Sequence, residues 1–500
     1  MNNPQAISLV GPEHQDYLRD ESRRSGQAVA ITFPRTEADV RSALHDARQH
    51  SWSVTIQGAR TGVTAGAVPE GGLILNLSRM SNIGPIRRGN LITVQPGALL
   101  SDIRAAIKPH GLFFPPDPTE TSASIGGMLA CNASGAQSYH YGPTRQWIQA
   151  LRVILADGRS MRLERGMKAR GQHFAIRTDS GDTVTGELPV LPSPPSIKSA
   201  AGYHIQSDMD LIDLFIGMEG TLGIVTEIDL ILIPAPARIQ ALTTFFPNEA
   251  AALNFVRFLR GDANHSLPTP PVAIEFFDAN ALALLRLAKA DNPAFSKLPS
   301  LPDRFHTAIY IEFHGDQASP IDDSIALAAE TLSSLGANPD DCWFADTPKD
   351  LETLKTFRHA TPEAVNLTID QRRKLHPGLT KLGTDMSVPD DCLEKVMTIY
   401  HSDLASSGLD YVIFGHIGNN HVHVNILSRT MEDYARGKAL YLEWARAIIN
   451  MGGSISAEHG IGKLKVALLH LMVGDDGIRS MKQIKRIFDP AGLLNPGNLF

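Results

Sequence analysis

Hydrophobic positions in the first third of the chain follow two different spacings, and each predicts a different element. After a capping-box sequence at residues 36–39, apolar side chains recur every three or four positions, which predicts a helix with one buried face. These side chains are Val40, Leu44 and Ala47. Aliphatic runs then predict strands at residues 54–57, 72–77 and 91–94, and a second helix is predicted at residues 99–107, before Gly111.

Strands dominate the pattern from about residue 150, and a second mixed region follows Pro234-Ala-Pro236. Further strands are predicted at residues 151–155, 160–163, 273–277, 308–313, 411–415 and 422–426, and a largely apolar stretch at residues 223–233 ends at a plausible domain boundary. Helices are predicted at residues 280–290, 319–336 and 390–406, and at the start of the tail that begins at Gly474. Residues 181–196 are rich in Pro and Gly and are interpreted as an excursion or a mobile loop.

Composition restricts the class of protein. The chain has 500 residues, more than one hydrophobic core usually holds, so two or three domains are expected. A hydrophobic fraction of 43% and a net charge of −7 without a basic block indicate a globular protein that does not bind nucleic acid. Cys131, Cys342 and Cys392 form no CxxC pair, which favours a reduced compartment. No signal peptide or membrane span is predicted, so we expect a cytoplasmic protein.

Three glycine-rich loops lie within the first half of the chain. They cover Gln57–Gly62, Thr121–Gly142 and Gly217–Gly223. Backbone N–H groups at such turns form concavities that bind anions, although a single glycine loop is more often only a tight turn. The loops contain neither a GxGxxG dinucleotide signature nor a Walker lysine.

Histidines and a carboxylate are concentrated in two short segments near the C-terminus. His416, His421 and His423 lie in the first segment, and Glu458 and His459 lie in the second. Along a strand at residues 421–426, the two histidines and Asn425 share one face, opposite Val422, Val424 and Ile426. Imidazole and carboxylate groups suit a borderline divalent ion such as Zn²⁺. A lone HxH on a strand is more often a surface or satisfied core feature, so this alternative stays open.

The order of the loops and of the histidine segments resembles the FAD-binding, PCMH-type (type 4) flavoproteins of the vanillyl-alcohol-oxidase family. The resemblance runs from about residue 34 to 236 and resumes from 415 to 497. It implies an α+β fold with an FAD-binding domain of two α/β subdomains and an α/β cap domain with an antiparallel sheet. A C-terminal segment would return to the FAD domain. The expected boundaries are 27–236, 237–460 and 461–500.

The same resemblance implies FAD as the cofactor. Its pyrophosphate would lie on Gly58–Gly62 and on Gly126 and Gly127. The full set of implied FAD-binding residues is Gln57, Gly58, Ala59, Arg60, Thr61, Gly62, Pro96, Pro118, Thr121, Ser124, Gly126, Gly127, Asn132, Gly135, Tyr141, Gly142, Glu219, Gly223, Ile224, Val225 and Asn495. Some family members attach the flavin to a histidine of the first loop. Arg60 and Thr61 stand in that loop here, with no histidine, so non-covalent FAD is expected.

The subgroup that the chain resembles most includes the glycolate oxidase D subunit, FAD-linked D-lactate dehydrogenase and D-2-hydroxyglutarate dehydrogenase. Its pattern His-x-Gly-Asp-Gly-Asn-x-His implies His416, His423 and Glu458 as ligands of a divalent metal, with zinc the first candidate. It implies His459 as the catalytic base. This chain departs from the pattern at residues 419–421, which are Asn, Asn and His. His421 is therefore either an extra ligand or a supporting residue.

The implied reaction is oxidation of a D-2-hydroxy acid to the 2-oxo acid, with hydride passing to flavin N5. Lactate, glycolate and 2-hydroxyglutarate are the substrate types. The subgroup's carboxylate-binding arginine precedes an Asp-x-x-Val-Pro element, here at residues 385–389, which implies this role for Arg358, with Lys381 as a second candidate. Planar arginine pairs well with carboxylates. A solvated arginine on a helix is the alternative that stays open. An electron-acceptor protein or a quinone-linked partner at the inner membrane is compatible with this interpretation, as is a homodimer. Two alternatives remain, an alkylglycerone-phosphate-synthase-like transferase and an electron-relay flavin subunit of a larger dehydrogenase.

Overall fold

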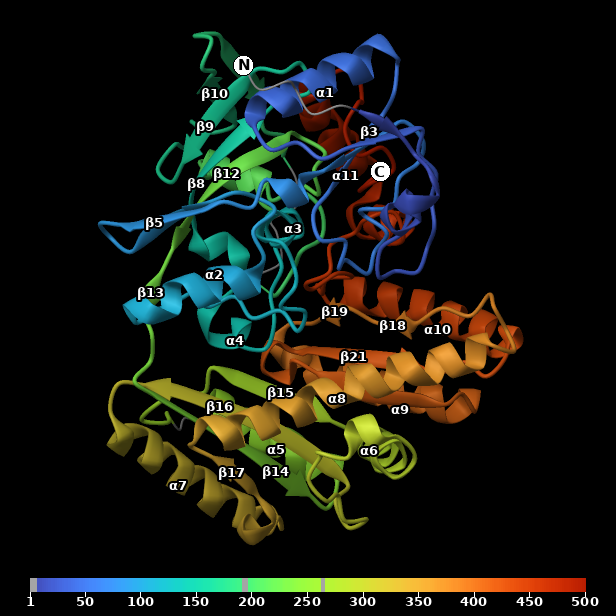
Figure 1. Cartoon of the computed structure of the whole chain (residues 1–500). Coiled ribbons are helices and arrows are strands. Elements are labelled where there is room, and N and C mark those ends of the chain that lie inside the picture. Colours follow the sequence, from blue (N-terminus) through green and yellow to red (C-terminus); the bar gives the residue numbers. More distant parts are fainter. Residues whose placement is uncertain (1–6, 191–196, 262–265) are drawn as a thin grey trace. The chain divides into compact units, whose positions relative to one another are not determined.

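The computed structural model describes residues 7–190, 197–261 and 266–500, and its chain divides into two compact units. Unit 1 consists of Met1–Gly135, Gly142–Ala235 and Ile455–Phe500, and unit 2 consists of Ala136–Tyr141 and Pro236–Ser454. The elements of both can be followed by colour in Figure 1. Among the described residues, no helix combines the length and apolar character needed to cross a bilayer.

Unit 1 begins with a small four-stranded sheet of order β1-β2-β4-β3. Its strands are β1 (Ser8–Leu9), β2 (Ala30–Thr32), β3 (Val54–Gln57) and β4 (Leu73–Asn76), and β2, β4 and β3 run parallel. Helix α1 (Glu37–Gln49) packs its apolar face on this sheet, where Leu44 meets a core that includes Leu73. The helix predicted from the apolar spacing and the capping box is therefore confirmed, with Thr36 as the cap.

A five-stranded antiparallel sheet of order β5-β6-β12-β8-β9 forms the second part of unit 1. Its strands are β5 (Ile83–Arg87), β6 (Leu91–Val94), β8 (Ile148–Ile154), β9 (Ser160–Glu164) and β12 (Ile224–Ile231). Shorter strands are β7 (Leu112–Phe113) and β13 (Ile233–Pro234), and the helices here are α2 (Leu100–Ile107) and α3 (Ile125–Ala130).

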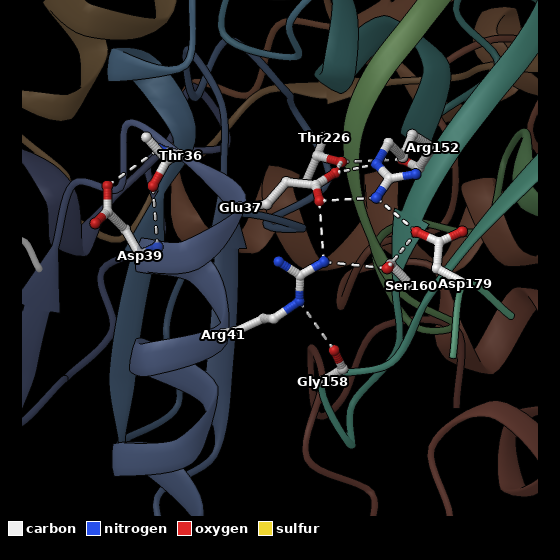
Figure 2. Close-up of polar contacts among 9 residues, drawn as sticks. All are labelled: Thr36, Glu37, Asp39, Arg41, Arg152, Gly158, Ser160, Asp179 and Thr226. Atoms are coloured by element: carbon white, nitrogen blue, oxygen red, sulfur yellow. Dashed lines mark hydrogen bonds and ion pairs between the residues drawn. The ribbon is translucent and has the colours of Figure 1, made fainter. Parts of the chain in front are cut away.

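Partly buried polar contacts join α1 to the second sheet (Figure 2). Arg152 on β8 donates to Glu37 Oε1 at 2.6 Å and to Asp179 Oδ2 at 2.6 Å. Arg41, one turn along α1, also bonds Glu37, together with Ser160. Burial alone would raise the pKa of Glu37, but the hydrogen bonds from Arg152 and Thr226 lower it below its usual value. The Glu37 carboxylate thereby joins α1, which packs on the four-stranded sheet, to the five-stranded sheet.

The C-terminal segment returns to unit 1, as the resemblance implied. Helix α11 (Val466–Phe488) ends there, and Leu494 pairs in parallel with Val54 beside β3. The helix begins before Gly474, where the sequence pattern had placed its start, and Gly474 interrupts it with φ +68°.

Of the two interpretations of residues 181–196, an excursion or a mobile loop, the mobile loop was wrong for residues 183–187. There β11 (Thr183–Glu187) pairs with β10 (His173–Arg177) as an antiparallel hairpin. Val184 is 5% exposed while its neighbours are exposed, so alternation over five residues was present but obscured by the surrounding Pro and Gly. Residues 191–196 of that segment lie outside the described residues.

Unit 2 is built on one eight-stranded antiparallel sheet, with order β17-β14-β16-β15-β20-β21-β18 and β19 paired to β21. Its strands are β14 (Arg238–Phe246), β15 (Ala273–Phe277), β16 (Thr307–Gly315), β17 (Trp343–Ala345), β18 (Leu382–Gly383), β19 (Met386–Ser387), β20 (Tyr411–Gly415) and β21 (His421–Ile426). Its helices are α4 (Ser138–Tyr141), α5 (Glu249–Arg260), α6 (Ala279–Asp291), α7 (Ala318–Ser334), α8 (Pro348–Arg373), α9 (Leu393–Ser407) and α10 (Met431–Asn450).

The two faces of this sheet carry different residues. On one face, Phe245 and Phe277 pack with Leu282 of α6 and Phe357 of α8. On the other face, Phe246 packs against Phe255 of α5, with ring centroids 5.3 Å apart. Toward β20 and β21, the face covered by α6 and α8 changes from apolar to polar. Phe414 of β20 pairs with His423 of β21, so a phenyl ring and an imidazole lie side by side on this face. The histidine cluster of unit 2 described below lies at this end of the sheet.

Candidate functional site

The first two glycine loops of unit 1 meet at Ser124. Its hydroxyl oxygen caps α3 by accepting from Gly127 N at 3.4 Å, and it also accepts from Ala59 N at 3.1 Å. A Cβ added at Gly58 would lie 2.1 Å from the same oxygen, so only glycine fits there. Similarly, a Cβ at Gly126 would lie 2.6 Å from Pro96 Cβ. Ala59 and Ser124, which are 65 positions apart in sequence, thus lie on one surface lined by backbone groups.

The first loop leaves space beside this surface. Arg60 has φ +64°, and its guanidinium lies 4.3 Å from the ring centroid of Tyr17. A Cβ at Gly62 would meet no described heavy atom within 4 Å. Small residues and turned backbone let phosphate groups approach N–H donors closely, so this loop pair fits the pyrophosphate of FAD.

Other predicted flavin residues hold the loops in place through their side chains. Gln57 donates to Tyr17 O and Ala67 O, each at 2.7 Å. Asn495 accepts from Ile56 N at 2.7 Å and donates to Glu219 O at 2.7 Å. These contacts join the first loop, the third loop and the C-terminal segment.

Glu219 connects the third loop to the segment that contains Glu458 and His459. Its two carboxylate oxygens accept from Ile461 N at 2.6 Å and Gly462 N at 2.7 Å. Burial raises the pKa of Glu219 to about 7, although these two bonds act in the opposite direction. Both carboxylate oxygens of Glu219 thus bind backbone N–H groups of unit 1.

The remaining predicted flavin residues are distributed along the same loops, with one exception. A Cβ at Gly135 would lie 1.7 Å from Asp117 O, next to Pro118, and one at Gly223 would lie 2.5 Å from Val153 Cγ1. The residues of unit 1 in this group are Pro118, Thr121, Asn132, Gly135, Gly142, Gly223, Ile224 and Val225. The exception is Tyr141, which belongs to unit 2 and whose hydroxyl lies 2.8 Å from His314 Nδ1.

Glu458 lies in a buried ion pair that the sequence did not predict. Its Oε2 is 2.7 Å from Lys198 Nζ and 3.3 Å from the Ser134 hydroxyl oxygen, and its Oε1 is 3.6 Å from His459 Nε2. Lys198 and Glu458 are only 5% and 9% exposed, whereas His459 is 34% exposed. Glycines at 460 and 462, with φ +73° and +52°, turn the chain just after this pair.

Three histidines of unit 2 converge at one end of the β20–β21 hairpin. Each offers one ring nitrogen, and these atoms of His416, His421 and His423 lie within 4.8 Å of one another. The ring centroids are 5.3 Å apart for His416 and His421, 5.7 Å for His416 and His423, and 4.5 Å for His421 and His423. Asn420, in the turn between His416 and His423, has φ +51°.

Acceptor groups fix the orientation of these rings. His416 Nδ1 lies 2.7 Å from Glu275 Oε1, and His423 Nδ1 lies 2.7 Å from Thr384 O. A carboxylate or carbonyl on one ring nitrogen of a histidine is the usual support for a metal on the other nitrogen. The donor set of this cluster therefore fits a borderline divalent metal.

Arg358 lies on α8 beside a second polar cluster of unit 2. It is 8% exposed, and its guanidinium carbon lies 6.0 Å from the ring centroid of Tyr310. Nearby, Glu312 Oε1 is 2.8 Å from His314 Nε2 and accepts from Gln137 Nε2 at 2.8 Å. Burial alone would raise the pKa of Glu312, but His314, Tyr310 and the charge of Arg358 lower it below its usual value.

Sequence reasoning did not identify Glu275, Glu312 or Lys198 as parts of these clusters. Glu275 and Glu312 each stand as a lone charge in an otherwise buried apolar strand, and this signal could have identified them. Lys198 had no such signal, because its partner lies 260 residues away in sequence.

Comparisons with known families agree with this fold and these loops. The family described as FAD linked oxidases, C-terminal domain, matches residues 235–499, and the family described as FAD binding domain matches residues 28–164. The chain belongs to the FAD-linked oxidases. It is accordingly an FAD-binding oxidoreductase, as the resemblance implied.

Curated relatives match nearly the whole chain. A D-lactate dehydrogenase of Anaerostipes hadrus is 29% identical over 510 residues, which is 98% of this chain and 94% of the relative. The glycolate oxidase subunit GlcD of Bacillus subtilis is 28% identical, covering 99% and 96%. A D-2-hydroxyglutarate dehydrogenase of Xanthomonas citri is 28% identical, covering 97% and 92%.

Solved structures share the fold at low sequence identity. p-Cresol methylhydroxylase matches with a TM-score of 0.70 at 16% identity, covering 99% of this chain and 93% of that chain. An alkyldihydroxyacetonephosphate synthase matches with a TM-score of 0.63 at 16% identity, covering 95% and 77%. The predicted PCMH-type α+β fold is thereby confirmed.

Proposed function

We propose that this protein oxidises a D-2-hydroxy acid of the lactate, glycolate or 2-hydroxyglutarate type to the 2-oxo acid. One observation carries the proposal: ring nitrogens of His416, His421 and His423 lie close together in a flavoprotein. The relatives of this flavoprotein are named for such substrates. FAD, bound without a covalent link, would accept the hydride that leaves C2 of the substrate.

The proposal gives each predicted catalytic or metal-binding residue a role that the resemblance implies. In unit 1, an imidazole nitrogen of His459 removes the proton of the 2-hydroxyl group. Glu458, His416 and His423 would bind a divalent metal, with zinc the first candidate, which lowers the pKa of that hydroxyl. Arg358 of unit 2 binds the substrate carboxylate in a planar, two-point contact. The reduced protein then passes its electrons to an acceptor protein or a quinone-linked partner.

Anaerobic flavin bleaching tests this proposal. Each D- and L-2-hydroxy acid of a panel is mixed with the oxidised protein, and the loss of flavin absorbance is followed in stopped flow. At least one D-acid is expected to bleach the flavin, and a chelator is expected to slow bleaching until Zn²⁺ is restored. If no acid of the panel bleaches the flavin, the transferase or the electron-relay function replaces this one. Fast bleaching that is insensitive to thorough chelation would remove the metal from the reaction.

His459→Asn separates the base from substrate binding. Loss of a general base slows proton removal by about 10²–10⁴-fold while leaving the dependence on acid concentration largely unchanged. His470→Asn is the matched control, because His470 is a half-exposed histidine of unit 1 paired with Asp475. Equal bleaching rates in His459→Asn and wild-type protein would overturn the assignment of the base.

A further inference from the structure

His421 is the residue at which this chain departs from the histidine pattern of its subgroup, and it is also fully buried. It is 0% exposed, and its Nε2 lies 3.1 Å from Oδ1 of Asp385, which is likewise 0% exposed. Its ring centroid is 4.5 Å from that of His423. A histidine so placed faces the other two imidazoles and not solvent.

We propose that His421 is a third nitrogen ligand, so that unit 2 binds its divalent metal through His416, His421 and His423. This inference rests on the proposed function only in taking a metal to be present. One ring nitrogen of each histidine lies within 4.8 Å of those of the other two, and imidazole nitrogens are common ligands of divalent metals. A divalent cation accepts all three lone pairs at once.

Each of the three rings has an oxygen atom close to one of its nitrogens. Glu275 on β15 and the carbonyl oxygen of Thr384 hydrogen-bond His416 and His423. Asp385, the residue just before β19, places its Oδ1 3.1 Å from His421 Nε2. Such acceptors fix the ring plane and raise the basicity of the opposite nitrogen, which prepares a histidine for a metal.

Residues 384–387, the segment that contains Thr384 and Asp385, are hydrogen-bonded to β21. Val424 N donates to the Thr384 hydroxyl oxygen at 2.9 Å, and Ser387 pairs with His421 in the antiparallel register of β19 and β21. The acceptors and the rings therefore belong to one hydrogen-bonded piece of sheet. The hairpin is also closely packed at Gly415, because a Cβ there would lie 2.8 Å from the His423 ring.

Charge and ligand chemistry point to one class of metal. Glu275 and Asp385 are 3% and 0% exposed, and a divalent cation among the three rings would offset their two negative charges. Three imidazole ligands favour Zn²⁺ or Co²⁺, whereas Mg²⁺ and Ca²⁺ prefer oxygen ligands.

Cobalt binding to the flavin-containing protein tests the inference without a catalytic assay. Chelator-treated protein is titrated with Co²⁺ by calorimetry, and the visible ligand-field bands are recorded in a difference spectrum against the flavin. His421→Asn introduces the residue that the subgroup pattern has, and it is expected to weaken Co²⁺ binding by about 10–100-fold and to change the bands. Asp385→Asn should weaken binding by about tenfold. His401→Asn, which alters a unit 2 histidine paired with Glu249, should leave binding unchanged.

Proton NMR of the cobalt-loaded wild-type protein counts the imidazole ligands even if a variant fails to fold. Three strongly shifted, exchangeable ring N–H signals are expected, and two would overturn the inference. His421→Asn that binds Co²⁺ as tightly as wild-type protein, with unchanged bands, would also overturn it. If wild-type protein binds no Co²⁺, both the three-histidine site and the role of a metal in the proposed reaction are wrong. If Co²⁺ binds as expected but no 2-hydroxy acid bleaches the flavin, the proposed reaction fails and the three-histidine site stands.

Discussion

Lys198 Nζ lies 2.7 Å from Glu458 Oε2, and neither side chain is more than 9% exposed. The carboxylate proposed as a metal ligand is thus neutralised by a cation of its own unit. Removing one member of such a pair leaves an uncompensated buried charge, which usually costs more than the intact pair contributes.

Lys198→Met is therefore expected to lower the free energy of unfolding by about 3 kcal/mol, measured by guanidinium denaturation of chelator-treated protein. The double variant Lys198→Met/Glu458→Gln should recover most of this loss, because it leaves no lone charge. The exposed pair Arg446 and Glu443 serves as the control, and Arg446→Met should change stability by less than about 1 kcal/mol. Strictly additive effects of the two substitutions would show that the pair is not coupled.

Glu219 should make the stability of the protein fall as pH rises. Its pKa in the folded protein is about 7, against 4.5 in the unfolded chain, so the folded state binds more protons between these values. The free energy of unfolding should consequently decrease from pH 4.5 to pH 7, with an upper bound of about 3 kcal/mol from this group.

Glu219→Gln should remove this slope, because glutamine does not titrate, while losing one of the two backbone acceptors. Thermal unfolding at matched ionic strength across the same pH window measures the difference between variant and wild-type protein. Parallel pH profiles of the two proteins would contradict the assignment. Glu394→Gln, which alters an exposed carboxylate paired with Arg257, is the control and should leave the slope unchanged.

Arg358→Lys should raise KM for the acid that bleaches the flavin by about 10–100-fold, because lysine cannot form the two-point contact with a carboxylate. Steady-state kinetics with an artificial electron acceptor measure this value. Arg436→Lys, at a half-exposed arginine paired with Asp433 on α10, should leave KM unchanged. An unaltered KM in Arg358→Lys would place the carboxylate contact elsewhere.

The flavin should leave the protein on acid denaturation. The first loop carries Arg60 and Thr61 and has no histidine to form a covalent link. After precipitation with trichloroacetic acid, we expect the yellow colour in the supernatant, with the mass of FAD. A yellow pellet would mean that another residue forms the link.

Much of the fold could be predicted from the sequence because its signals are local. The capping box before α1, the alternation in β21 and the glycines of the first two loops each act within a few residues. The hairpin β10–β11 was missed because Pro and Gly around it obscured a short alternation. Helices α8 and α10 were not predicted as elements, since their buried residues do not form one continuous apolar stripe.

The sequence by itself determined which residues could do chemistry: glycine loops without a Rossmann signature, histidines at alternate positions of one strand, and a carboxylate next to a histidine. Only the tertiary structure decided their neighbours. It placed Ser124 against Gly58, Asp385 beside His421, and Lys198 on Glu458. The physical reason is that local propensity depends on residues a few positions apart. The partner of a buried charge or imidazole is set instead by sheet register and packing across long stretches of chain.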